Sequence, residues 1–71
     1  MLRIIDGRDL PPPEPLELVL AALDTLPDGE ELLLRLYCQP YPLFQILRRN
    51  GYVWQETLLE EGTHEIHIRK A

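Results

Sequence analysis

The pattern of apolar residues predicts an α-helix in the first third of the chain. Apolar side chains recur there with helical spacing and form one stripe, made of Leu16, Val19, Leu20, Leu23 and Leu26. The proline-rich residues 11–15 come directly before this stripe. Prolines suit a first helical turn, because its N–H groups have no acceptor within the helix. We therefore predict a helix that begins in this run and ends at about Leu26.

Shorter apolar segments indicate four β-strands. Each has the length of a strand and is bounded by residues that form turns. Residues 31–37 are rich in leucine, which favours helices, so this strand is predicted mainly from its length and its bounding residues. The predicted strands are residues 2–5, 31–37, 52–58 and 63–69. Turn signals at residues 6–9, 27–29 and 59–62 separate them from the neighbouring elements.

A second, shorter helix is predicted between the second and third strands. Pro42 suits its first position, and Asn50-Gly51 supplies a left-handed ending. Its apolar face consists of Leu43, Ile46 and Leu47. We expect residues 37–42 to form a rigid loop, because a residue that precedes proline avoids the helical conformation.

The predicted order of elements is β-α-β-α-β-β. Helices between the first three strands imply parallel neighbours, and the final hairpin makes the fourth strand antiparallel. The predicted fold class is therefore an α+β two-layer sandwich, with a four-stranded mixed sheet and both helices on one face. With 71 residues, the chain is expected to form a single domain over residues 1–71.

Alternation along the strands divides their side chains between the two faces of the sheet. The side chains predicted to face the helices are Leu2, Ile4, Leu32, Leu34, Leu36, Trp54, Leu58, Ile66 and Ile68. The open face then carries Ile5, Leu33, Tyr37 and Val53 among Arg3, Arg35, Gln55, Glu65, His67 and Arg69. This mixture is more apolar than a solvated face normally is, which favours docking of a protein partner or formation of a homodimer. Alternatively, long side chains such as those of Arg35 and Arg69 cover the apolar ones.

Charge and cysteine content narrow the class of protein. Twelve acidic and seven basic residues give a net charge of −5, so binding to nucleic acid or to an anionic membrane is not expected. The uncharged apolar run of residues 18–23 is far shorter than the ~20 residues that cross a bilayer. Cys38 is the single cysteine, which excludes an internal disulfide and favours a cytoplasmic location.

Residues along the whole chain carry a family likeness. They are Asp6, Leu10, Pro13-Glu14-Pro15 at a helix start, Gly29-Glu30 before the second strand, Pro40 after it, and Gly51 after the second helix. In order and spacing the chain resembles the TusA/SirA-like superfamily. With Pro40-Tyr41-Pro42-Leu43 it is most similar to the branch called domain of unknown function 2249. The resemblance implies a setting in redox, sulfur or nitrogen-oxide metabolism.

Two positions depart from the sulfur carriers that the chain resembles. Those carriers have a Cys-Pro-x-Pro motif at the first helix, and their cysteine bears the persulfide. Pro12 stands at the matching position here, so the carrier mechanism does not transfer to this chain. Asp9 stands where the carriers usually have glycine, and aspartate tolerates a left-handed backbone better than most residues.

The loops after the first two strands form the predicted rim of a site. Parallel neighbouring strands bring these loops together at the carboxyl end of the sheet, where open α/β sheets tend to bind ligands. The predicted rim residues are Arg8, Asp9, Pro12, Pro13, Glu14, Cys38, Gln39 and Tyr41. An aromatic lip of Tyr37, Tyr41 and Phe44 around a small-ligand cleft is a further expectation.

Two interpretations of Cys38 are open. In the first, it replaces the missing carrier thiol and is activated by the start of the first helix and by Arg8. In the second, it is a small apolar plug in the core, which is the side chain's commonest role. The alternation of Leu32, Leu34 and Leu36 points Cys38 towards the helices and favours the plug.

No catalytic or metal-binding constellation is predicted. His64 and His67 lie an odd number of residues apart on a strand, which places them on opposite faces and excludes a shared metal ion. The chain contains no serine and no glycine-rich phosphate loop. We therefore expect no metal, no cofactor and no enzymatic activity.

The leading functional hypothesis is a non-catalytic accessory or protein-interaction module on a sulfur-carrier-like fold. It would bind a partner through the open sheet face or the proline-rich rim. The alternatives are a persulfide carrier that uses Cys38, and a small-ligand protein that uses the cleft between the two loops.

Overall fold

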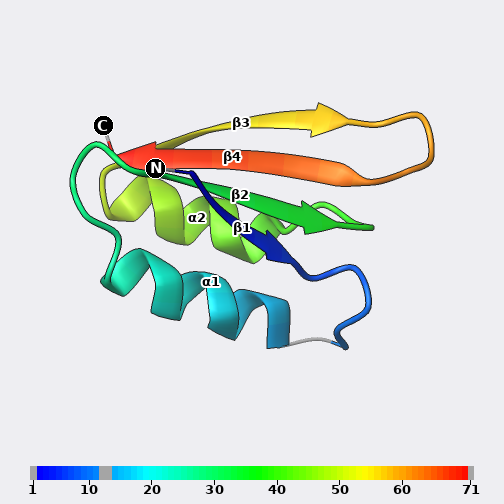
Figure 1. The fold of residues 1–71 in the computed structure, drawn as a ribbon, viewed down its shortest axis with the longest axis horizontal. Coiled ribbons are helices and arrows are strands. Elements are labelled where there is room, and N and C mark those ends of the chain that lie inside the picture. Colours follow the sequence, from blue (N-terminus) through cyan, green and yellow to red (C-terminus); the bar gives the residue numbers. More distant parts are fainter. Residues whose placement is uncertain (1, 12–13, 71) are drawn as a thin grey trace.

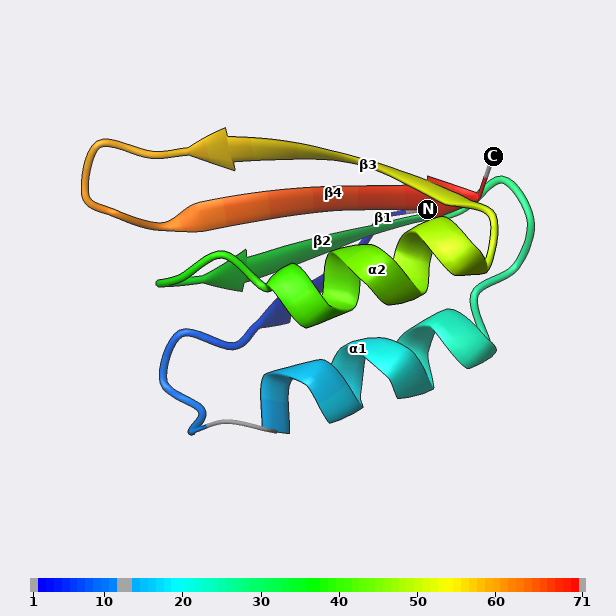
Figure 2. The ribbon, with the colours of Figure 1, turned by 180° about the vertical axis from the view of Figure 1, so that it is seen from behind.

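In the computed structural model, which describes residues 2–11 and 14–70, two helices pack against one face of a four-stranded sheet. The elements are β1 (Leu2–Asp6), α1 (Glu14–Asp24), β2 (Glu31–Leu36), α2 (Tyr41–Arg49), β3 (Tyr52–Leu58) and β4 (His64–Lys70). Figures 1 and 2 show both helices on the same side of the sheet, with its other side uncovered by any described segment. The predicted α+β sandwich and the order of its elements are confirmed.

The core is a single apolar layer between the helices and the sheet. Its buried side chains come from both layers and are Val19, Leu23, Leu26, Leu32, Leu34, Leu36, Leu43, Leu47, Ile66 and Ile68. The stripe predicted for α1 faces this layer, with Leu16 and Leu20 partly buried at its margin. On α2, Phe44 stacks on Trp54 of β3 with ring centroids 5.2 Å apart. The apolar layer therefore holds both helices on the same face.

The strand order differs from the expected one. The sheet runs β1-β2-β4-β3, with β1 parallel to β2 and β4 antiparallel to both β2 and β3. The prediction that the second and third strands are neighbours was therefore wrong. The short loop between β3 and β4 predicts that these two strands pair as a hairpin. It does not determine which of them lies beside β2.

The side chains of β1 face the opposite way from the prediction. Ile5 is paired with Leu34 and packs on the core, whereas Ile4 is paired with Leu33 on the open face. Arg3 also lies on the helix side, where its Nη1 donates to Oγ1 of Thr25 at 3.4 Å. A long arginine at a sheet edge keeps its charge in water while its stem covers the core, so alternation alone did not reveal the buried face.

Leu2, Ile4 and Leu58 were predicted to face the helices, but all three are exposed. Leu2 and Ile4 follow the reversed orientation of β1. Leu58 has the alternation of the helix side, but it lies in the part of the β3–β4 hairpin that extends past the helix layer (Figure 1).

The ends of the helices and strands agree with the predicted signals to within two residues. The helix α1 ends at Asp24, two residues before the predicted end. Helix α2 begins at Tyr41, so Pro42 takes its second position, where a missing N–H is equally harmless. Gly51 follows α2 with a φ of 79°, as the Asn-Gly ending requires. No helix in the described residues is long and apolar enough to cross a membrane.

A core substitution tests this packing. Leu47 is fully buried, so Leu47→Ala is expected to lower the free energy of unfolding by ~2 to 5 kcal/mol. The matched control is Leu18→Ala, because Leu18 is 47% exposed on the outer side of α1 and loses the same atoms. We expect that control to change stability by only about 0.5 kcal/mol. Urea unfolding measures both, and equal losses would contradict the helix orientation.

Candidate functional site

The two predicted site loops lie at one end of the molecule. The carboxyl ends of β1 and β2 point to the same side as the first turns of α1 and α2 (Figures 1 and 2). The β3–β4 hairpin extends past them at this end (Figure 1). The parallel pairing of β1 with β2 produces this arrangement, as the sequence analysis expected.

The loop after β1 is held by an ion pair. Arg8 donates from Nε and Nη2 to the two carboxylate oxygens of Asp6, at 2.9 and 2.7 Å, and its backbone N–H also donates to Asp6 at 3.2 Å. These bonds hold the pKa of the Asp6 carboxyl at about 2, below its usual 3.8, and raise the pKa of Arg8. The guanidinium is thereby committed to its own loop.

Close packing of a glycine brings the same loop against α1. A Cβ atom at Gly7 would lie 2.9 Å from Leu36 Cδ2 and 3.1 Å from Pro15 Cβ. A larger residue here would press on the Leu36 side chain and on the Pro15 ring, so glycine suits the close passage of the backbone between them. The backbone N–H of Gly7 also donates to the carbonyl of Arg35 at 2.9 Å, which extends the β1–β2 pairing.

The loop after β2 is held by a chain of side-chain hydrogen bonds that the sequence analysis missed. Gln39 donates to Glu56 at 2.9 Å, and Nδ1 of His64 lies 3.0 Å from the second oxygen of the same carboxylate. The hydroxyl of Tyr41 donates to the Gln39 amide oxygen. Glu56 lies two residues after Trp54, so strand alternation could have placed it on the helix side. No pattern in the sequence indicates that Gln39 is its hydrogen-bond partner.

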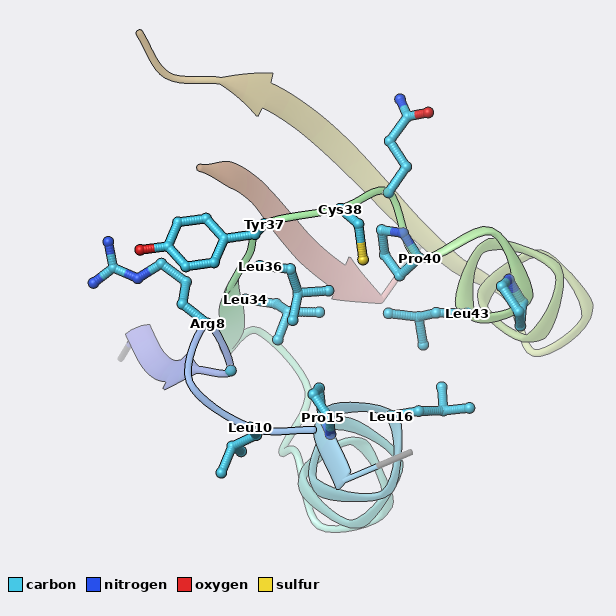
Figure 3. A pocket seen from close by; sticks show the side chains of 13 residues that line it. Arg8, Leu10, Pro15, Leu16, Leu34, Leu36, Tyr37, Cys38, Pro40 and Leu43 are labelled. Carbon is cyan, nitrogen blue, oxygen red and sulfur yellow. The ribbon is translucent and has the colours of Figure 1, made fainter. Parts of the chain in front are cut away.

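Between the two loops lies a cleft with a volume of about 480 Å³ (Figure 3). Its floor is formed by Leu34 and Leu36 of β2. Its walls come from both helices and both loops, through Pro15 and Leu16, Pro42 and Leu43, and Leu10 and Pro40. The lining is therefore almost wholly apolar.

Cys38 is exposed and lines this cleft. Figure 3 shows its sulfur on the cleft side of the loop, near Pro40. The interpretation of Cys38 as a buried core plug was therefore wrong. Its alternation does direct it towards the helices, but β2 ends at Leu36 and Cys38 lies beyond the core.

The predicted rim is assembled only in part. Arg8, Cys38 and Gln39 line the cleft, whereas Asp9, Glu14 and Tyr41 are exposed and outside the lining. Pro12 and Pro13 lie outside the described residues. Of the expected aromatic lip, Tyr37 lines the cleft, whereas Tyr41 and Phe44 contact each other edge to face outside the lining. Figure 3 shows Tyr37 beside Arg8.

The open sheet face is the second candidate site. Its side chains form three rows across β1, β2, β4 and β3, namely Leu2, Glu31, Arg69 and Val53; Ile4, Leu33, His67 and Gln55; and Asp6, Arg35, Glu65 and Thr57. Leu33, Arg35, Val53 and His67 lie there as predicted, and Tyr37 continues the alternation of β2. Ile5 does not lie on this face, which carries Leu2 and Ile4 instead.

Contacts between polar side chains cross the open face between neighbouring strands. Nε of Arg35 lies 2.9 Å from Glu65, and Nε2 of His67 lies 3.4 Å from Glu31 without forming a hydrogen bond. These contacts connect β2 with β4. A shallow hollow of about 290 Å³ borders Val53, Gln55, His67 and Arg69.

The two histidines of β4 were considered as a possible metal pair. His64 pairs with Leu36 and His67 with Leu33, which places them on opposite faces as expected. No group of three His, Cys, Asp or Glu side chains in the described residues is arranged to hold a metal ion.

The Asp6–Arg8 pair gives a pH-dependent prediction. Because the pKa of Asp6 is lowered on folding, the pair stabilises the fold above about pH 3.8, and this contribution is lost as the pH falls through about 2. An NMR titration of the Asp6 carboxyl should have its midpoint near 2, and Arg8→Gln should return it towards 3.8. Arg35 is only a minor influence on Asp6, so Arg35→Gln is the control. An unmoved midpoint in Arg8→Gln would contradict the ion pair.

Comparison with known proteins places the chain in a family. The model of the family described as "Uncharacterized conserved protein (DUF2249)" matches residues 4–70. Neither the curated proteins nor the solved structures contain a match to this chain. The wider likeness to TusA/SirA-like carriers stays a prediction. Because the family model covers nearly the whole chain, this protein belongs to the DUF2249 family of uncharacterised conserved proteins.

Proposed function

We propose that this protein is a non-catalytic accessory module that binds a partner protein through its open sheet face. One observation carries the proposal. Among the described residues, seven large apolar side chains are exposed, and three of them, Leu2, Ile4 and Val53, lie on this face. A fourth, Tyr37, lies just past the end of β2 and points away from Leu34 and Leu36 (Figure 3). Exposed apolar side chains gathered on one face are typical of an interaction surface.

The charges of the face suit burial against a protein. Arg35 and Arg69 on the face, together with Arg8 that pairs with Asp6 at its edge, balance the carboxylates Asp6, Glu31 and Glu65, whereas the whole chain carries a net charge of −5. Arg8 and Arg35 are already paired with Asp6 and Glu65. A partner would therefore cover few charges that lack an opposite neighbour, which lowers the desolvation cost of binding.

A pair of matched substitutions tests the proposal. Ile4 on the open face and Leu18 on the helix layer are similarly exposed, at 52% and 47%. Affinity capture with the wild-type chain from lysate of the source organism identifies the partner. Ile4→Glu should then weaken binding of the purified partner by about ten-fold or more, since a carboxylate would be buried in an apolar contact. Leu18→Glu adds the same charge and should leave binding unchanged.

Three results would count against the open face. Equal binding by both variants would place the interface elsewhere. Loss of binding with Leu18→Glu alone would move it to the helix layer. No specific partner, together with a monomer in sedimentation, would remove the proposal, whereas a dimer lost in Ile4→Glu would identify the partner as a second copy.

The exposure of Cys38 favours a second candidate, a persulfide carrier in the cytoplasm that serves sulfur, redox or nitrogen-oxide metabolism. In that reaction the Cys38 thiolate attacks the outer sulfur of a donor cysteine persulfide. A Cys38–sulfur bond forms, the donor's S–S bond breaks, and the donor thiolate leaves. The sulfur lies at the surface of the cleft, where a donor loop can reach it.

Intact-mass analysis decides this second candidate. After incubation with a cysteine desulfurase and free cysteine, the native protein should gain one sulfur atom. The control Cys38→Ala should gain none. An unchanged mass in the wild-type protein would show that the exposed thiol has no carrier role.

A further inference from the structure

The cleft between the two loops is built from segments that are individually fixed. Its floor, Leu34 and Leu36, belongs to the buried core of the sheet. One loop is held by the bidentate Asp6–Arg8 pair and the other by the hydrogen bond from Gln39 to Glu56. A cavity whose walls are already in place does not lose binding energy to ordering them.

The polar side chains at the border of the cleft form hydrogen bonds with other protein groups. Nε and Nη2 of Arg8 bind Asp6, and its Nη1 lies 3.5 Å from the hydroxyl of Thr63. Figure 3 shows the guanidinium directed away from the cleft, alongside Tyr37. The amide of Gln39 binds Glu56 and Tyr41. Among the described residues, therefore, these border groups offer no free charge to a bound molecule.

The size and shape of the cleft suit a compact ligand. Its volume of about 480 Å³ lies within the range of about 300–1,000 Å³ typical of small-molecule sites. The sheet, both helices and both loops contribute to its lining, so several segments can contact one compact molecule. Extended peptides bind instead along sheet edges or long grooves, and the cleft therefore suits a small molecule better.

We propose that the cleft between the β1–α1 and β2–α2 loops binds a small, uncharged, largely hydrocarbon molecule, with the Cys38 thiol at its border. The binding energy would come from covering those side chains of the lining that are still partly open to water, which are Leu10, Pro15, Leu16, Pro40 and Pro42. An ionised ligand would be disfavoured, because its charge would be desolvated without a partner.

The first test is an NMR titration with 1-octanol and, as a matched probe, octanoate. Saturable amide shifts with octanol should be confined to residues 7–10, 16 and 37–43. Octanoate has the same number of carbon atoms but ends in a carboxylate, and at neutral pH it should bind at least about ten-fold more weakly. Equal or tighter binding of octanoate would overturn the proposed chemistry, and so would shifts spread over the open sheet face.

The second test uses Cys38 as a reporter and needs no variant. Saturating octanol should slow alkylation of the native thiol by iodoacetamide by about five-fold, because covering a thiol limits its access to reagent. In denaturing urea the same octanol concentration should have no effect. An unchanged native rate would contradict a ligand at this border.

Variants at one position then localise the ligand. Cys38→Phe places an aromatic ring in the cleft and should weaken octanol binding about ten-fold or more by occupying its volume. Cys38→Ser keeps the space and should retain binding. The amide spectrum verifies that each variant is folded, and Ile4→Glu should leave octanol binding intact because Ile4 lies on the other face of the sheet.

An apolar side chain from a protein is the competing occupant. N-acetyl-leucinamide is the probe for it. Shifts of the cleft residues with this compound but not with octanol would reassign the cleft to a protein partner and overturn the small-molecule proposal.

Discussion

The burial of one apolar layer under two short helices determines the architecture of this chain. The central strands β2 and β4 contribute Leu32, Leu34, Ile66 and Ile68 to that layer, and all four are at most 1% exposed. The two helices of the described residues cover one face of the sheet. In small domains a large share of the surface stays in contact with water, and here the other sheet face is part of that share.

Polar contacts outside the core set the positions of the site loops. Helix packing fixes where β1 and β2 end, but it does not fix the chain that follows them. Asp6 with Arg8 determines the first loop, and Glu56 with Gln39 determines the second. Glu56 belongs to the β3–β4 hairpin. The third and fourth strands therefore help to shape a cleft whose walls come mainly from β2, the two helices and the loops that precede them.

Sequence patterns predicted the elements well and their arrangement less completely. The spacing of apolar residues and the positions of turn-forming residues predicted both helices and all four strands, because backbone conformation depends on local residues. Alternation did not predict which side chains of β1 face the helices. Arg3 lies on the helix side and Leu2 is exposed, although their polarity suggests the reverse. The insertion of β4 beside β2 depends on contacts between distant residues, for which a single sequence gives no local signal.

The same distinction applies to the candidate sites. Arg8, Cys38 and Gln39 were predictable at the cleft because topology alone places loop residues at one end of the sheet. The exposure of Cys38 was not, because it depends on β2 ending at Leu36. The composition of the open face was mostly correct despite the reversed β1. One isoleucine replaced another, with Ile4 taking the position expected for Ile5.

The two candidate surfaces meet at the loop after β2. Tyr37 continues the open face and also lines the cleft, while Cys38, the next residue, presents its sulfur to the cleft alone. Tyr37 and Cys38 are consecutive residues of the bend that follows β2, so one short segment borders both surfaces. A partner that moved Tyr37 would therefore act on a wall of the cleft, and a molecule in the cleft would act on the edge of the open face. By thermodynamic reciprocity, any such effect on affinity would be equal in both directions.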